Sequence, residues 1–388
     1  MFFYISFLRP PATQSYPSGT ISITPQVAND LRTEPFDGAQ EIYYSWSPVN
    51  PNSAEPYPAI SAPQKLTVWR QSSAYKEIPV PLPQGLREGQ SYRLVLTAHG
   101  QGRPHIINLA ASDLGTRPFP VLSMPVLFSS RGRAGKQEQI ERVYRIPLQA
   151  GTNGFLTVRE QTSFDLDKKI WDSGIGLSSW LVQLAQEADQ MISNHPQTSL
   201  VREALFSSES RRIIELGTAL PHSAGTGIVS LTVGALRSTA PDAGNGCIIT
   251  TDLDSAMPLL EHNVSANGHL FSSLSTRPRP LVLDWDDEGL PQDVVAIGEG
   301  FDAIIMADVT YNTASFPSLV RTLSSLIQLS PPSKPPIIVL GYKERDAAER
   351  TLWSMVEDVG VTFEKIGERS GAGGQAVEAW IGRCKVHV

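Results

Sequence analysis

The feature that most constrains the fold is the alternation of short apolar runs with helical patterns after about residue 165. Five runs have the length and β-branched content of buried strands: RRIIELG (211–217), CIITTDL (247–253), PLVLDW (280–285), FDAIIMAD (301–308) and PIIVLGY (336–342). Amphipathic segments of helical period separate most of them. Strands joined by such crossovers run parallel. The sequence therefore predicts an α/β fold with a doubly wound, Rossmann-like sheet.

The end of the chain departs from this alternation. The segments VTFEKIG (361–367) and EAWIGRCKV (378–386) are joined by ERSGAGGQA, which has no helical pattern. A short glycine-rich connection of this kind favours a hairpin. We therefore expect a terminal antiparallel hairpin at the edge of the sheet.

The first part of the chain has a different composition. It is rich in proline and turn residues, as in 47–63, with short β-like runs such as KLTVW (65–69) and YRLVLTA (92–98) between them. Proline at this density argues against central strands. We predict a β-rich, proline-rich N-terminal extension over residues 1–150, whose role the residues do not indicate, and a second domain over residues 151–388.

Composition excludes several classes of function. The chain has 388 residues, 41% of them hydrophobic, and a net charge of −7 with acidic and basic residues mixed. This supports a large packed core and gives no field suited to nucleic acid. The two cysteines form no CxxC pair, and MFFYISFLRPPA lacks a basic region and is broken by prolines. We expect a cytoplasmic protein, with the nucleus also compatible, that has no metal site and binds neither nucleic acid nor membrane; the oligomeric state is not indicated.

The stretch FDAIIMADVTYN (301–312) ends an apolar run on Asp308 and places Tyr311 three residues later. In open α/β sheets, ligands bind at the carboxyl ends of the strands, so a charged group there is well placed for chemistry. Asp at a strand end is also an ordinary N-cap for the following helix. Taken alone, the stretch favours neither interpretation.

The first two predicted strands also end in residues suited to a nucleotide. IIELGT is followed by glycines and the helix-like GIVSLTVGAL (227–236), and glycines let the backbone approach a ligand closely. Asp252, at the end of the second strand, can accept hydrogen bonds from ribose hydroxyls. The alternative is a tight turn followed by a capping aspartate.

Two tryptophans allow two readings each. Trp285, at the carboxyl end of the third predicted strand, could stack on an adenine or belong to the core. Trp171 precedes an amphipathic helix within 168–185, for which Asp172 or Ser173 is a plausible cap. Its ring could close over a ligand or staple that helix.

Together these segments resemble the seven-β-strand methyltransferases of family 16, whose best-known members are protein-lysine methyltransferases that use S-adenosyl-L-methionine. The resemblance rests on WDSGIGLSSWLVQLA, IIELGT with GTGIVSL, TDLDSAMPLLEHNVSAN, LDW and ADVTYN with FPSLVRTLSSL, which occur in the family's order. It covers roughly residues 155–386. The family's hallmark Asp-x-x-Tyr matches Asp308 and Tyr311.

The resemblance implies a seven-stranded class I methyltransferase sheet and a protein substrate that presents a lysine. Asp308 and Tyr311 would lie where that lysine enters, as the catalytic pair. The positions that match the cofactor site are Trp171, Glu215, Gly217, Thr218, Gly225, Gly227, Asp252, Trp285 and Ala307.

One departure concerns the glycine loop. The family's loop is usually a compact Glu-Leu-Gly-x-Gly-x-Gly, whereas here ALPHSA (219–224) separates Gly217-Thr218 from Gly225. This insertion, which contains His222, either bulges outward or weakens cofactor binding. Two other functions therefore stay open: a non-catalytic methyltransferase-like scaffold, and a small-molecule N-methyltransferase, because fold does not fix function. An NAD-dependent dehydrogenase is disfavoured, since Asp-x-x-Tyr and the terminal hairpin have no role there.

Overall fold

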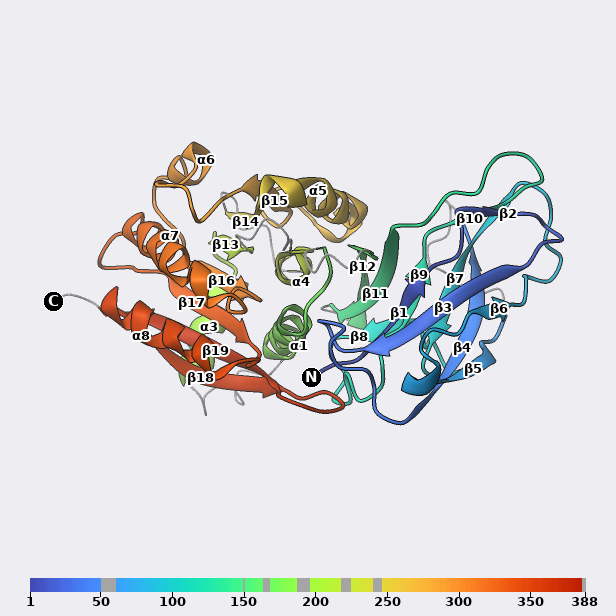
Figure 1. Cartoon of the computed structure of the whole chain (residues 1–388). Coiled ribbons are helices and arrows are strands. Elements are labelled where there is room, and N and C mark those ends of the chain that lie inside the picture. Colours follow the sequence, from blue (N-terminus) through green and yellow to red (C-terminus); the bar gives the residue numbers. More distant parts are fainter. Residues whose placement is uncertain are drawn as a thin grey trace.

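A computed structural model describes residues 1–49, 61–148, 151–162, 168–186, 196–217, 225–239 and 246–385. A strand-rich N-terminal part lies beside an α/β part (Figure 1). The end marked N lies at the junction of the two, beside helix α1 (Asp172–Gln186) (Figure 1). Within the described ranges, no helix combines the length and apolar character needed to cross a bilayer.

The α/β part is built on a seven-stranded mixed sheet in the order β15-β14-β13-β16-β17-β19-β18. The first five strands in this order pair in parallel, whereas β19 pairs antiparallel with both β17 and β18. The predicted mixed α/β architecture is confirmed. The strands are β13 (Arg212–Leu216), β14 (Cys247–Asp252), β15 (Pro278–Val282), β16 (Ala303–Ala307), β17 (Ile337–Tyr342), β18 (Val361–Arg369) and β19 (Val377–Cys384).

Helices cover both faces of this sheet. Side chains of α1, α3 and α4 share one apolar cluster with Ile305, and side chains of α7 and α8 share another with Ile304. Neighbouring residues of β16 thus serve opposite faces, which is why the whole strand is apolar. The other helices are α3 (Pro196–Phe206), α4 (Ile228–Arg237), α5 (Met257–Ala266), α6 (Gln292–Val295), α7 (Phe316–Gln328) and α8 (Thr351–Asp358), and the 3₁₀ turns are η1 (Gln71–Ser73), η3 (Asp254–Ala256), η4 (Gly268–Leu270), η5 (Thr313–Ser315) and η6 (Ala347–Arg350).

The predicted strands differ from the observed ones mainly at β15. The run PLVLDW was expected to form the third strand, but β15 begins at Pro278 and ends at Val282, so Trp285 follows the strand. Only the single turn α6 lies between β15 and β16 among the helices described there. The reason is that polar, turn-forming residues dominate 286–300, and they offer no long apolar stripe.

The N-terminal part contains a three-stranded sheet, β1-β3-β6, and a nine-stranded sheet in which β7 pairs with β4, β9 and β10. The high proline content of this region was expected to exclude central strands. That expectation is wrong for β7, because the run that forms this strand contains no proline. The strands are β1 (Tyr4–Arg9), β2 (Gln14–Ser15), β3 (Ile21–Ala28), β4 (Ala39–Pro48), β5 (Gln64–Arg70), β6 (Ile78–Val80), β7 (Gln90–Thr97), β8 (Ile106–Asn108), β9 (Val121–Ser123), β10 (Val126–Phe128), β11 (Gln139–Pro147) and β12 (Asn153–Gln161).

The two parts are joined by shared packing. The expected boundary after residue 150 falls between β11 and β12, which pair with each other from Gln139–Gln161 to Pro147–Asn153. One apolar cluster also contains Phe2 and Tyr4 of the first part together with residues of α1 and α4. A continuous core of this kind fixes the position of the N-terminal strands relative to the α/β sheet.

The ion pair between Arg142 of β11 and Glu160 of β12 tests this packing. The Arg142 Nε–Glu160 Oε1 distance is 2.7 Å and both side chains are buried. Arg142→Met removes the guanidinium that pairs with the buried Glu160 carboxylate, so we expect about 3–5 kcal/mol of lost stability. Arg383→Met is the control, because the Arg383–Glu364 pair is about half exposed, and it should cost about 1 kcal/mol or less. Urea denaturation measures both, and equal losses would contradict the prediction.

Candidate cofactor and methyl-transfer site

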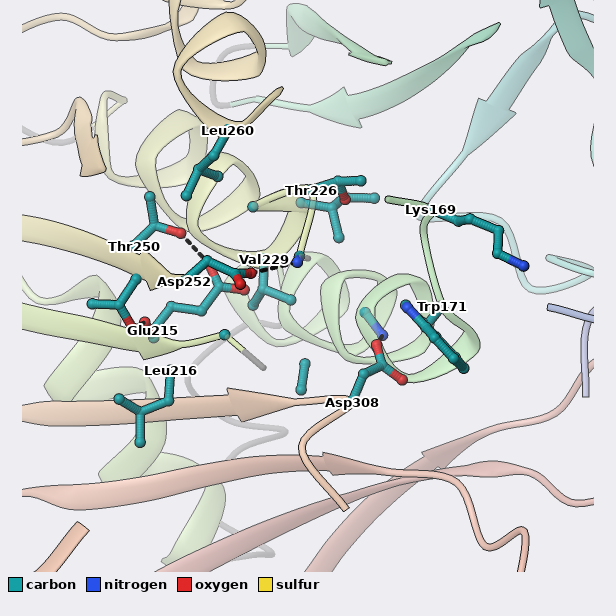
Figure 2. A pocket seen from close by; sticks show the side chains of 17 residues that line it. Lys169, Trp171, Glu215, Leu216, Thr226, Val229, Thr250, Asp252, Leu260 and Asp308 are labelled. Atoms are coloured by element: carbon teal, nitrogen blue, oxygen red, sulfur yellow. Dashed lines mark hydrogen bonds between the residues drawn. The ribbon is translucent and has the colours of Figure 1, made fainter. Parts of the chain in front are cut away.

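A pocket opens where β13, β14 and β16 end, beside the first turns of α1 and α4 (Figure 2). It brings together most of the residues expected at the cofactor and transfer site: Trp171, Glu215, Gly217, Gly225, Gly227, Asp252, Ala307 and Asp308. The wall also contains residues that the sequence did not single out: Lys169, Gly174, Leu216, Thr226, Ile228, Val229, Thr250, Thr251 and Leu260.

Two of the expected residues do not line this pocket. Trp285 is only 2% exposed and packs in the apolar cluster of α7, while its carbonyl oxygen accepts a hydrogen bond from Arg321. Tyr311 contacts a residue of the wall, because its ring stacks on Trp171 at 5.4 Å between centroids. Thr218 and the insertion 219–224, with His222, lie outside the described residues.

Glu215, the residue before the last in β13, has a buried carboxylate. Its Oε2 accepts hydrogen bonds from the backbone N–H of Ser230 and the hydroxyl of Thr250, each at 3.1 Å. Ser230 lies in the first turn of α4, where the helix dipole favours an anion. Burial raises the pKa of Glu215, and these hydrogen bonds oppose the rise.

The glycine loop fits closely against β14. The Gly217 N–H donates to the Thr251 carbonyl oxygen at 2.9 Å, and a Cβ at Gly217 would lie 2.2 Å from that oxygen. Asp252 accepts hydrogen bonds from the N–H groups of Gly225 and Leu253. The backbone therefore reaches the pocket at a place where a side chain does not fit.

Asp308 follows β16 with a φ of 61°, in the left-handed region that non-glycine residues seldom adopt. Its Oδ2 accepts a hydrogen bond from the Gly174 N–H at 3.0 Å, and its Oδ1 accepts one from the Ser173 hydroxyl. Burial raises the pKa of Asp308 to about 6, although Arg345 and Ser173 oppose the rise. Strained backbone and a shifted pKa both mark functional sites.

Asp308 was expected either to cap the helix that follows it or to present a charged group at the ligand-binding edge of the sheet. The structure excludes the capping role. Asn312, not Asp308, caps the turn that follows, because its side chain accepts from the Ala314 N–H. Asp308 instead accepts from the first turn of α1, a helix more than a hundred residues earlier in the chain. It therefore ties β16 to α1 at the edge of the pocket.

Arg345 is a residue of this site that sequence reasoning missed. Its NH2 nitrogen lies 3.5 Å from Asp308 Oδ1, and its Cζ atom lies 5.2 Å from the centroid of the Trp171 ring. The signal available was the polar run KERD (343–346) directly after the fifth predicted strand. Trp171 thus contacts both Tyr311 and a cation.

A family model described as lysine methyltransferase matches residues 151–359, more than half of the chain. The chain belongs to the lysine methyltransferase family. The family, the methyltransferase activity and the use of S-adenosyl-L-methionine predicted from the sequence are confirmed by this match.

Relatives of this lysine methyltransferase include "Protein-lysine N-methyltransferase EFM6" of Saccharomyces cerevisiae, 25% identical over 192 residues that cover 49% of this chain and 68% of the relative. Another is "EEF1A lysine methyltransferase 3" of Xenopus tropicalis, 33% identical over 126 residues that cover 32% of this chain and 45% of the relative. A solved structure of magnesium protoporphyrin IX methyltransferase from Synechocystis PCC 6803 is 12% identical, covers 53% of this chain and 83% of its own, and has a TM-score of 0.31. Likeness at that score does not bear on the function.

The pocket fits S-adenosyl-L-methionine by the chemistry of its wall. Carboxylates suited to hydroxyl and ammonium groups line the pocket at Glu215 and Asp252, and Gly217, which has no Cβ to meet the Thr251 carbonyl oxygen, lets the loop lie against β14 in the pocket wall. The Trp171 Nε1 atom is buried and has no hydrogen-bond partner among the described residues. Residues of β13, β14 and the glycine loop would therefore hold the cofactor.

Gly217→Ala tests whether the glycine loop forms part of the cofactor site. The added Cβ would displace the loop from Thr251, so the affinity for S-adenosyl-L-methionine should fall about tenfold or more, which is about 1.4 kcal/mol. Gly268→Ala is the matched control, because nothing lies within 4 Å of its Cβ position. Isothermal titration calorimetry measures both variants, and an unchanged Kd in Gly217→Ala would show that this loop does not form the site.

Proposed function

We propose that this lysine methyltransferase methylates the side-chain amine of a lysine in a protein substrate, with Asp308 receiving that amine. The family match and the names of the two curated relatives support a protein lysine as the acceptor. The observation that carries the proposal is the position of Asp308: a buried carboxylate in a left-handed conformation, directly after Ala307 in the wall of the pocket.

The strand order supports the finer assignment of the fold. A parallel sheet whose strand order reverses at β13, and in which the antiparallel strand β19 lies between β17 and the edge strand β18, is the arrangement expected of a class I methyltransferase. We also propose that residues 151–388 form the methyltransferase domain, which agrees with the start of the family match at residue 151. The strands before it would then form an N-terminal module.

Methyl transfer to an amine is a displacement, so the protein contributes mainly alignment and charge. When bound, S-adenosyl-L-methionine supplies a methyl group on a positively charged sulfur, which passes to the lysine nitrogen. A lysine amine has a pKa of about 10.4 in water and must lose a proton before it can attack. The Asp308 carboxylate would accept a hydrogen bond from the incoming ammonium and orient it, and the proton would leave to water.

Tyr311 supports this alignment indirectly. Its ring stacks on Trp171 at an interplanar angle of 22°, and Trp171 lines the pocket. Tyr311 would therefore hold the Trp171 ring in place beside the site. We infer that the two residues of Asp-x-x-Tyr have different roles: the acid lines the pocket, and the phenol supports a residue of the pocket wall.

Asp308→Asn tests the proposed role. The amide keeps the size and backbone preference of aspartate but cannot carry its charge, so methyl transfer should fall about a hundredfold or more. The measurement is transfer of labelled methyl into an extract of cells that lack this protein. Asp302→Asn is the matched control, because Asp302 lies just before β16, at the opposite end of that strand. Full activity of Asp308→Asn would remove Asp308 from the mechanism, whereas no transfer by the wild type with cofactor bound would favour the scaffold function.

The pH dependence of transfer gives a second test. Because burial raises the pKa of Asp308 to about 6, its carboxylate is present above that pH and is lost below it. Labelled-methyl transfer should therefore decline as the pH falls through about 6. Arg345 lowers the pKa of Asp308, so Arg345→Gln should move this decline to higher pH. A decline at the same pH in both proteins would argue that another group titrates.

A further inference from the structure

Five charged side chains meet where the N-terminal strands contact the α/β sheet, and we call them the junction cluster: Asp30, Asp172, Asp308, Lys343 and Arg345. Asp30 comes from the connection between β3 and β4, whereas the other four belong to the methyltransferase part. All five lie at or near full burial. Charges this deep in a protein require close partners.

Asp30 is the best-satisfied acid of the cluster. Its Oδ1 accepts from the Leu31 N–H at 3.0 Å and from Lys343 Nζ at 3.1 Å. Its Oδ2 accepts from the Asp172 N–H at 3.2 Å and from the Arg345 NH2 nitrogen at 3.0 Å. These four donors use the whole acceptor capacity of a carboxylate.

Asp308 is held less tightly by the same cation. The Arg345 NH2 nitrogen that lies 3.0 Å from Asp30 lies 3.5 Å from Asp308. Apart from this contact, Asp308 accepts only from Ser173 and Gly174 among the described residues. Arg345 therefore pairs with Asp30 first and with Asp308 second.

We propose that Asp30, supplied by the N-terminal module, is a positioning residue of the methyl-transfer site: it holds Arg345 off Asp308, so that the Asp308 carboxylate can face a cationic ligand. This rests on the proposed function, because it assigns Asp308 to the ligand side of the pocket. The cation that benefits is the sulfonium of the cofactor or the ammonium of the target lysine. The module thus completes the site electrostatically.

The charges around Asp308 support this assignment. The junction cluster has three carboxylates and two cations, and the longest ion pair falls on Asp308. Three other groups face the cluster: the Lys169 amine donates to the Asp30 carbonyl oxygen, the Tyr4 hydroxyl donates to Asp172, and the Met1 amino group donates to the Gln375 carbonyl oxygen.

Loss of the Asp30 charge should lower the pKa of Asp308. The negative charges of Asp30 and Asp172 add to the burial that raises the pKa of Asp308. Without Asp30, this repulsion weakens and Arg345 is free to pair fully with Asp308. Both effects lower the pKa of Asp308 and reduce its attraction for another cation. A role of Asp30 in stability alone predicts neither effect.

The test compares S-adenosyl-L-methionine with S-adenosyl-L-homocysteine, which lacks the positive charge. Calorimetry on the full chain gives both affinities from about pH 5 to about pH 8. The preference is the ratio of the affinity for S-adenosyl-L-methionine to the affinity for S-adenosyl-L-homocysteine. In the wild type, this preference should grow as the pH rises through about 6, and Asp308→Asn should abolish this growth. Asp30→Asn should move the growth to lower pH and reduce the preference at the upper end about threefold or more, which is about 0.65 kcal/mol.

Matched variants separate positioning from folding. Asp302→Asn makes the same chemical change in a buried acid paired with Arg211 and Lys334, and it should leave the preference and its pH dependence unchanged. Asp30→Glu keeps the charge and should restore the wild-type behaviour. If Asp30 acts through Arg345, Asp30→Asn should have a smaller effect in an Arg345→Gln protein than in the wild type. Arg345→Gln alone should raise the preference, and this result is independent of whether Asp30→Asn folds.

The outcomes that would overturn the proposal are distinct. If a folded Asp30→Asn protein has the wild-type preference, and this preference grows around the same pH as in the wild type, then Asp30 does not position Arg345. An unchanged preference in Arg345→Gln would show that Arg345 does not act on Asp308. No affinity of the wild type for S-adenosyl-L-methionine would overturn the proposed function together with this inference. Loss of the pH-dependent growth in Asp308→Asn, with Asp30→Asn like the wild type, would overturn the positioning role alone.

Discussion

The arrangement of this protein depends on the ion pair and hydrogen bonds that compensate the buried carboxylate of Asp172 in the first turn of α1. Removing such charges from water costs several kcal/mol each unless partners surround them. Asp172 meets that requirement with Lys343 of the sheet and with Phe2 and Tyr4 of the N-terminal strands. The same few atoms therefore join three regions of the chain beside the site.

The pocket itself follows from the parallel sheet. Each of β13, β14 and β16 delivers one acid at its carboxyl end: Glu215, Asp252 and Asp308. The three acids have different partners, however. Glu215 and Asp252 accept hydrogen bonds from the glycine loop, β14 and α4, whereas Asp308 faces α1 and a guanidinium. The proposed cofactor region and the proposed position of the acceptor amine thus lie side by side at one edge of one sheet.

Local patterns were enough to predict the sheet and much of the pocket. The runs that form β13, β14, β16 and β17 stand out in the sequence because they are apolar, and Asp252 and Asp308 were singled out at the ends of two of them, whereas Glu215 was matched through the family resemblance. Contacts between distant segments carry no such pattern. Asp30 and Arg345 are separated by more than three hundred residues, and nothing near Asp30 indicates a buried partner. Trp285 shows the opposite limit, because an aromatic residue after a strand suits a ligand and a core equally well.

The left-handed backbone at Asp308 has an evolutionary consequence. Asparagine and glycine are the residues that adopt this conformation most readily, and neither carries a charge. One nucleotide change converts an aspartate codon into an asparagine codon. A descendant could therefore lose the acid and keep the shape of the strand end, so the charge at this position can change independently of the backbone.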